Sequence, residues 1–125
     1  MNTFKSRVIS GHGRGQLLGF PTLNLTIPKG LTAKHGVYAG WVIVAGQRFP
    51  GAFHFGPLPV FASPKPVLEV FVLEHTFAPV PKVLSFSLEH YLRPVKNFPS
   101  PAALSAQIKQ DVASTRRLLN LPQIS

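Results

Sequence analysis

Residues 36–55, GVYAGWVIVAGQRFPGAFHF, carry the clearest indication of fold class in this chain. The segments 36–44 and 48–55 are rich in β-branched and aromatic residues, which are the residue types enriched in strands. The Ala-Gly-Gln between them is a short turn signal, so the whole stretch predicts a β-hairpin. The chain is therefore expected to contain at least one antiparallel pair of long strands.

Two further strands are predicted downstream, at residues 67–74 and 82–92. Both alternating sets of VLEVFVLE are largely apolar, which indicates a strand in the middle of the sheet. In 82–92, apolar residues alternate with serine and glutamate, the pattern of one buried and one wet face. The 13 prolines and 10 glycines argue against a helical bundle, because both residues are confined to turns and element ends. An all-β frame is expected.

The C-terminal segment changes to a helical pattern. Ser100 and Pro101 are typical of an N-cap followed by a first helical turn. A stripe of residues at helical spacing follows, comprising Leu104, Ile108, Val112, Thr115 and Leu119. The sequence thus predicts one helix that ends near Asn120 and packs against a small antiparallel barrel.

Length and composition favour one soluble domain, residues 1–125. A chain of 125 residues can bury one hydrophobic core. It has no cysteine, no apolar N-terminal signal and no apolar run long enough to span a bilayer, so a cytoplasmic protein is expected. Its 13 Lys and Arg against 4 Asp and Glu give a formal charge of +9, which favours polyanionic partners such as phosphates or nucleic acid.

A glycine-rich stretch near the N-terminus could bind an anion. Gly11, Gly13 and Gly15 let backbone amides approach an anion closely, and Arg14 adds a fixed positive fork. The stretch lacks the Gly-Lys-Ser/Thr ending of a P-loop, so it would be a different kind of phosphate cradle. A mobile surface turn is the alternative interpretation.

Thr22 and Asn24 stand two positions apart in PTLNL. In an extended segment their side chains point the same way, while Leu23 and Leu25 face the core. A hydroxyl and an amide are neutral oxygen ligands, so they could hold magnesium only if a nucleotide supplied negative charge. The alternative is that both side chains satisfy backbone groups of a turn.

The chain offers only four carboxylates, Glu69, Glu74, Glu89 and Asp111. Glu69 shares its strand face with Phe71, so it is predicted to be the least solvated of the four. Desolvation raises the pKa of a carboxylate and makes it a better general base near neutral pH. An exposed glutamate, or one paired with a lysine, is the alternative. Asp111 is expected on the solvent side of the helix.

Arg93, Lys96 and Phe98 lie close together between the last strand and the helix. Two cations beside an aromatic plane suit a ligand with a flat ring, or a stacked base. The alternative is a strand exit in which Phe98 fills the barrel end and the cations face water. The five histidines show no metal-binding spacing and are expected to be structural or surface residues.

The order of these segments resembles the riboflavin kinase family. GHGRGQLLGFPTLNL (11–25) is similar to the family's Gly-x-Gly-Arg-Gly flap and Leu-Gly-Phe-Pro-Thr-Ala-Asn. HGVYAGWV (35–42) resembles its Gly-Val-Tyr segment, and LEVFVLEHTF (68–77) the strand with its catalytic glutamate. YLRPVKNFPSPAALSAQIKQDV (91–112) is similar to its Leu-Arg-x-x-x-Lys-Phe-like segment and following helix.

The resemblance implies a mainly β fold, a six-stranded antiparallel Greek-key barrel with one long C-terminal helix. It also implies roles for the candidate residues. Glu69 would be the catalytic base for the ribityl 5′-hydroxyl. The glycine loop (Gly11, Gly13, Arg14, Gly15) would close over ATP, Thr22 and Asn24 would contact its phosphates and Mg²⁺, and Arg93, Lys96 and Phe98 would border the flavin.

The chain departs from the family pattern in three places. Position 23 is leucine where the family usually has alanine, beside both proposed magnesium ligands. Val60 replaces a family threonine in GPLPVF. FAPVPKV (77–83) replaces the family's Leu-Tyr-Gly turn, in a segment that the resemblance places near the nucleotide.

The implied function is an ATP:riboflavin 5′-phosphotransferase that makes FMN. In many bacteria this module is the C-terminal half of a protein whose N-terminal half adenylylates FMN. We expect a single kinase domain without that adenylyltransferase half, acting as a cytoplasmic monomer on riboflavin and ATP, with no membrane or nucleic-acid partner. Two alternatives stay open: a basic barrel that binds single-stranded nucleic acid, and a flavin- or nucleotide-binding relative without catalysis.

Overall fold

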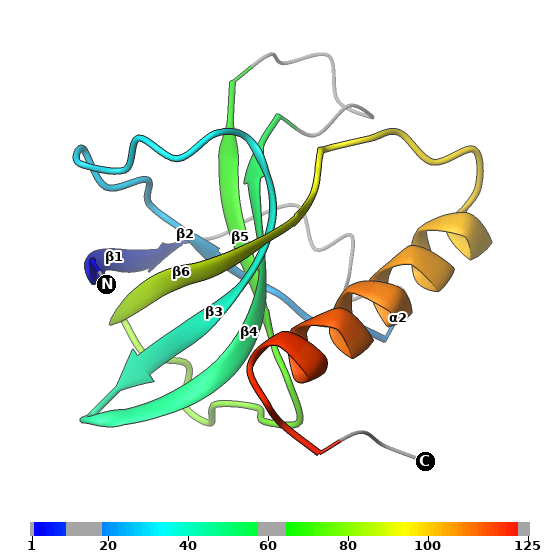
Figure 1. The fold of residues 1–125 in the computed structure, drawn as a ribbon. Coiled ribbons are helices and arrows are strands. Elements are labelled where there is room, and N and C mark those ends of the chain that lie inside the picture. The colour runs from blue at the N-terminus through cyan, green and yellow to red at the C-terminus, as the bar shows by residue number, and fades with distance from the viewer. Residues whose placement is uncertain (1, 10–18, 58–64, 123–125) are drawn as a thin grey trace.

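The computed structural model describes residues 2–9, 19–57 and 65–122. Within these ranges the chain forms six strands and one helix, as Figure 1 shows. Their bounds are β1 Phe4–Ile9, β2 Leu23–Leu25, β3 Gly36–Val44, β4 Gln47–Gly56, β5 Val67–Val72, β6 Val83–Arg93 and α2 Pro101–Leu118. The four strands predicted from the sequence are confirmed, whereas the sequence pattern had not delimited β1 and β2.

The strands close into a barrel in the order β1-β2-β5-β4-β3-β6, and every neighbouring pair is antiparallel. The hairpin predicted for 36–55 is the β3–β4 pair, whose register runs from Gly36 opposite Phe55 to Val44 opposite Gln47. A mainly β, six-stranded antiparallel barrel with one C-terminal helix is thus confirmed. Closure gives each strand a partner on both sides, which protects its backbone edges.

The hydrophobic core fills the barrel interior with side chains that alternate along the strands. Phe53 and Phe86 are fully buried, with ring centroids 5.4 Å apart. The buried core residues are Leu25, Tyr38, Val42, Phe53, Phe55, Leu68, Val70, Val72, Leu84 and Phe86. Because side chains alternate along a strand, the residues between these core positions point to the outer wall.

The helix α2 crosses the outer wall of the barrel over β3 and β4 (Figure 1). It begins as predicted, because the Ser100 hydroxyl accepts a hydrogen bond from the Ala103 N–H at 3.1 Å. The helix covers the outward-facing Val37 and Ala39 of β3, which are therefore buried. Across the described ranges, no helix is both long and apolar enough to cross a membrane.

The strands β3 and β6 approach each other closely at Gly40. Their register shifts between Ala39 and Gly40. A Cβ atom at Gly40 would lie 2.0 Å from the carbonyl oxygen of Ser87, so the backbone would have to move to admit it. Glycine therefore permits the pairing next to this irregularity.

The substitution Gly40→Ala should destabilise the barrel. Forcing one extra methyl group against backbone costs about 1–3 kcal/mol or more. We expect a lower urea midpoint with an unchanged slope, measured by far-UV circular dichroism. Gly30→Ala is the matched control, because a Cβ there has no neighbour within 4 Å. Equal midpoints for the two variants would contradict the proposed close approach.

Candidate active site

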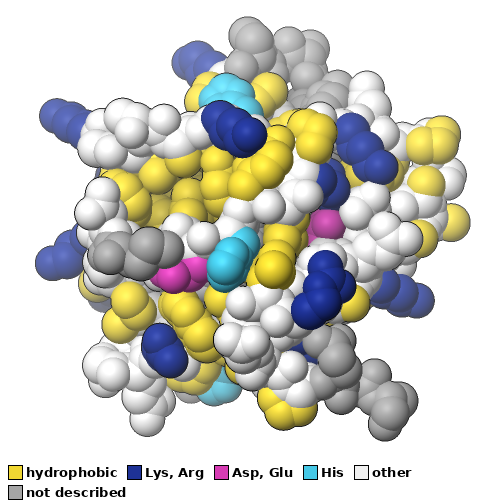
Figure 2. Space-filling model, in the orientation of Figure 1, with side chains coloured by type: hydrophobic (Ala, Val, Ile, Leu, Met, Phe, Trp, Pro, Cys, Tyr) yellow, Lys and Arg dark blue, Asp and Glu magenta, His cyan; other side chains and the backbone are white. Residues whose placement is uncertain are grey.

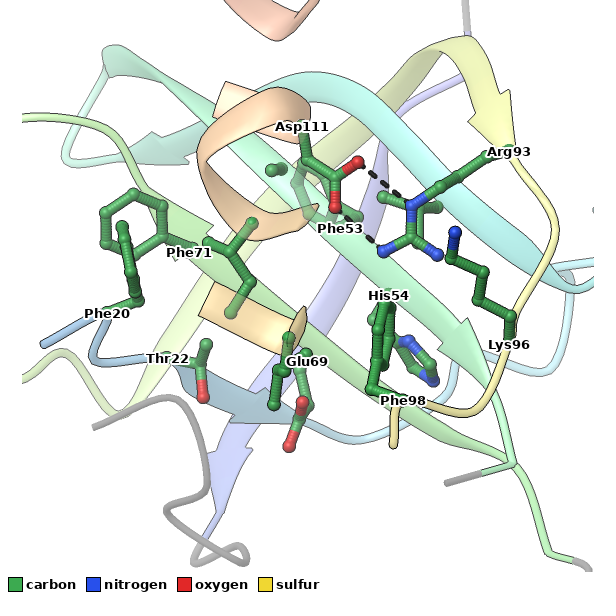
Figure 3. Close-up of a pocket in the computed structure, with 14 residues that line it drawn as sticks. Phe20, Thr22, Phe53, His54, Glu69, Phe71, Arg93, Lys96, Phe98 and Asp111 are labelled. Atoms are coloured by element: carbon green, nitrogen blue, oxygen red, sulfur yellow. Dashed lines mark hydrogen bonds and ion pairs between the residues drawn. The ribbon is translucent and has the colours of Figure 1, made fainter. Parts of the chain in front are cut away.

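A cavity opens on the outer wall of the barrel beside α2 (Figure 3). Strands β3, β4 and β5, the chain leading into β2, the end of β6, the connection after it and α2 all contribute to its lining. The lining residues are Phe20, Thr22, Val37, Ala52, Phe53, His54, Glu69, Phe71, Arg93, Lys96, Phe98, Leu104, Ile108 and Asp111. The sequence-predicted Thr22, Glu69, Arg93, Lys96 and Phe98 therefore share one cavity.

A row of cross-strand partners aligns the polar residues on this wall. Asn24 of β2 is opposite Glu69 of β5, and Glu69 is opposite His54 of β4. His54 is opposite Val37 of β3, which is opposite Arg93 of β6. Directly opposed residues in antiparallel strands point to the same face. Five strands thus present one line of side chains to the outside of the barrel.

Glu69, the candidate base, is buried, with only 8% of its surface exposed. It follows the core residue Leu68 and precedes the core residue Val70, so its own side chain points outward into the cavity. Phe71 lies on the same strand face and contacts Phe20 edge to face, with the ring centroids 5.5 Å apart. The predicted burial of this carboxylate is confirmed, but its cross-strand neighbours Asn24 and His54 are polar, and it is not the least exposed of the four, because Asp111 is 7% exposed.

Thr22 and Asn24 flank the first residue of β2. Thr22 lines the cavity. Asn24 is not among the lining residues; it is half-buried and lies opposite Glu69 in the β2–β5 pair. Leu25 is buried in the core and Leu23 packs against it, as the alternation predicts. The core therefore accommodates the larger side chain at position 23. Figure 3 shows Thr22 and Glu69 on the same side of the cavity.

Asp111 is a cavity residue, and the prediction that it faces solvent is wrong. It is 7% exposed, as deeply buried as Glu69. Its two carboxylate oxygens accept hydrogen bonds from Arg93, from Nε to Oδ1 at 2.9 Å and from Nη2 to Oδ2 at 2.8 Å. Gln107 also donates to Oδ1, at 3.0 Å. This bidentate ion pair compensates the cost of burying the carboxylate charge. The apolar stripe of the helix, on which the prediction was based, gives no sign of such a partner.

Lys96 and Phe98 come from the connection between β6 and α2. The Lys96 ammonium lies 5.4 Å from the centroid of the Phe98 ring, and the Arg93 guanidinium carbon lies 5.7 Å from it. In Figure 3 these residues stand at one end of the cavity, with Phe20 and Phe71 at the other. Glu69 lies between the two aromatic ends.

His54 is a cavity residue that the sequence interpretation missed. The histidines were expected to be structural or surface residues, yet His54 lines the cavity beside Glu69. Its ring nitrogen Nε2 lies 3.2 Å from the carbonyl oxygen of Gly56. The signal was present in the alternation, because Phe53 and Phe55 are both core residues and the histidine between them must point outward.

The predicted residues Gly11, Gly13, Arg14 and Gly15 lie outside the described residues, as does Val60. Segment 77–83 is described, and it contributes none of the described cavity lining. The turn before it is tied to the end of α2 instead, by an ion pair between Glu74 and Arg116. The hydrogen bond from Arg116 holds the pKa of the Glu74 carboxyl below its usual range.

The visible charge is dispersed rather than concentrated. In Figure 2, Lys and Arg side chains are scattered over this face, at its edge and nearer its middle, and hydrophobic side chains occupy parts of the surface between them. In the part of the chain that is described, no three His, Cys, Asp or Glu side chains are grouped to hold a metal ion.

These features define a small-ligand site on a closed β-barrel, with a buried carboxylate, two cations and aromatic rings around one cavity. The sequence model of the riboflavin kinase (flavokinase) family matches residues 2–119. The chain therefore belongs to the riboflavin kinase family and is an enzyme of the kinase class.

Individual relatives agree with this assignment. Riboflavin kinase of Homo sapiens is 30% identical over 129 residues, covering 95% of this chain and 81% of that protein. The bifunctional riboflavin kinase/FMN adenylyltransferase of Escherichia coli K12 is 30% identical over 116 residues, 92% of this chain and 37% of that protein.

A likeness among solved structures concerns the fold alone. A crystal structure described as a macrolide-efflux protein from Streptococcus pneumoniae superposes with a TM-score of 0.80 and 23% identity. The match covers 91% of this chain and 38% of that one. It supports the same barrel-and-helix architecture.

Proposed function

We propose that this protein transfers the γ-phosphoryl group of ATP to the 5′-hydroxyl of riboflavin, giving FMN and ADP. The observation that carries the proposal is the buried Glu69, which shares one cavity with Thr22, two cations and aromatic rings. Membership of the riboflavin kinase family supplies the substrate class. Cytoplasmic location, a monomeric state and a single-domain kinase that stops at FMN stay predictions.

Glu69 is proposed as the base on the acceptor side. Its carboxylate accepts the proton of the ribityl 5′-hydroxyl, whose oxygen then bonds to the γ-phosphorus while the bond to the β,γ-bridging oxygen breaks. Its position favours this role, because the side chain is buried and points into the cavity that it shares with Thr22 and the two cations. Asp111 suits it poorly, since Arg93 already donates to both of its oxygens.

The flavin ring is proposed to lie at the end of the cavity that Arg93, Lys96 and Phe98 border. An aromatic side chain offers a flat apolar surface to the isoalloxazine, and Lys96 is exposed enough to reach a polar ring edge. The ribityl chain would then extend toward Glu69, which lies between the two aromatic ends of the cavity.

Thr22 and Asn24 are proposed to hold Mg²⁺ together with the phosphates of ATP. Their hydroxyl and amide oxygens are hard neutral ligands, and Asn24 is directly opposite Glu69 in the β2–β5 register. Magnesium would neutralise charge on the transferring phosphoryl group. Phosphoryl transfer depends on such neutralisation more than on covalent catalysis by the protein. The glycine loop with Gly11, Gly13, Arg14 and Gly15 is proposed to close over the nucleotide.

Purified protein incubated with riboflavin, ATP and Mg²⁺ should produce FMN and ADP, separated by chromatography. Omission of Mg²⁺ should abolish the product, because the metal neutralises the negative charge of the transferring phosphoryl group. Binding of riboflavin without FMN would indicate a relative that has lost catalysis. Salt-dependent binding of oligonucleotides without quenching of riboflavin fluorescence would instead support the nucleic-acid alternative.

The substitution Glu69→Gln should lower kcat by roughly 10²-fold or more, because glutamine keeps the shape of the side chain and cannot accept the proton. Riboflavin affinity, measured by fluorescence quenching, should change little. Glu89→Gln is the matched control, since Glu89 does not line the cavity. A Glu69→Gln enzyme as fast as the parent would show that the base is elsewhere.

Replacing Asn24 with alanine should weaken the magnesium–nucleotide complex and leave riboflavin binding intact. The expected result is a KM for ATP raised about tenfold and a higher Mg²⁺ requirement, since one neutral ligand of the metal is lost. Asn2→Ala, at an exposed position before β1, serves as the control. An equal loss of affinity for ATP and for riboflavin would contradict the proposed division of the site.

A further inference from the structure

Two ion pairs among the described residues join α2 to the barrel. Asp111 pairs with Arg93 at the end of β6, and Arg116 pairs with Glu74 after β5. Asp111 and Arg93 line the cavity, whereas neither Glu74 nor Arg116 is among the residues that line it. Both pairs link the helix to the barrel, but the Asp111 side chain is 9% exposed and the Glu74 side chain 60% exposed, and only the Asp111 pair borders the ligand cavity.

The guanidinium of Arg93 is held by the protein itself. Nε and Nη2 donate to the two oxygens of Asp111, and Nη1 donates to the carbonyl oxygen of Pro94 at 3.1 Å. Three of the five N–H donors of an arginine are thereby engaged. The side chain is 17% exposed, so its remaining contact with the cavity is limited. Arg93 thus has a structural partner in place of a free ligand-binding fork.

The position of Arg93 sets where the following segment begins. Residues 94–98 have no regular secondary structure, and they carry Lys96 and Phe98 to the cavity. The bond from Arg93 to Pro94 fixes the start of this segment, and the Ser100 cap of α2 fixes its end. A short connection held at both ends loses most of its conformational freedom before a ligand arrives.

The charge of Asp111 has a second consequence. Arg93 and Lys96 both lie within 6 Å of the Phe98 ring, so two cations flank one aromatic side chain. Asp111 neutralises Arg93, whereas no carboxylate among the described residues forms an ion pair with Lys96. Without that carboxylate, a nearly buried guanidinium would be unpaired, which is costly enough to move the side chain and the segment after it.

We infer that Asp111 is a positioning residue for riboflavin: through Arg93 it fixes the segment that presents Lys96 and Phe98 to the flavin. The inference rests on the proposed function for the identity of the ligand. It predicts that Asp111 controls the affinity for the acceptor, and neither the affinity for ATP nor the chemical step.

The test compares Asp111→Asn with Glu74→Gln in the full chain. Each variant removes one carboxylate from an ion pair between α2 and the barrel and keeps the side-chain shape. Asp111→Asn should raise the KM for riboflavin and the dissociation constant from fluorescence quenching by about tenfold or more, because a bidentate charged contact is lost. Its kcat and its KM for ATP should stay within about twofold. Glu74→Gln should change neither KM.

Thermal unfolding of both variants separates positioning from simple loss of stability. If Asp111→Asn raises the two KM values equally, or keeps the parental KM for riboflavin, the inference is wrong. Asp111→Glu keeps a carboxylate at this position, so it should bind riboflavin more tightly than Asp111→Asn does. A riboflavin affinity no better than that of Asp111→Asn would also overturn the inference.

The outcome also distinguishes this inference from the proposed reaction. A parent protein that binds riboflavin without making FMN would refute the reaction, and the quenching titrations would still decide the role of Asp111. A parent protein that does not bind riboflavin would overturn both.

Discussion

The pairing of β5 with β2 on one side and β4 on the other is the constraint on which the site depends. It places Asn24, Glu69 and His54 in one row on the outer wall. Because side chains alternate with a period of two, a slip of one residue would turn Glu69 into the core and Leu68 or Val70 out of it. The same hydrophobic residues that fill the barrel therefore fix the direction of the candidate base.

The helix α2 converts this wall into a cavity. A sheet face alone would leave Glu69 and His54 open to water, whereas α2 and the connection before it cover the wall beside them. The helix contributes apolar contacts through Leu104 and Ile108, and a charged contact through Asp111. Apolar packing tolerates sliding, but a bidentate ion pair has one good geometry. The ion pair therefore adds directional precision to an otherwise adaptable interface.

Local sequence signals predicted the long elements and failed where tertiary partners decide. The β3–β4 hairpin and α2 follow from alternation, a turn and a cap, all visible within a few residues. β2 has only three residues, too few for a periodic pattern, and it is defined by its pairing with β1 and β5. The burial of Asp111 could not be predicted, because Arg93, the partner that stabilises it, lies 18 positions away. His54 could have been assigned from its two core neighbours.

The charge balance of the cavity explains why the excess of basic residues does not by itself define the site. Its described lining carries Glu69 and Asp111 against Arg93 and Lys96, so with His54 neutral the formal charges cancel. A triphosphate at such a wall gains little from the net charge of +9 that is spread over the molecule. Under the proposed function, its negative charge would be neutralised by a divalent ion and by groups beyond this lining, of which Arg14 is the proposed example. The proposed metal ligands Thr22 and Asn24 are uncharged, which fits this proposal because the nucleotide would bring the negative charge that the metal requires.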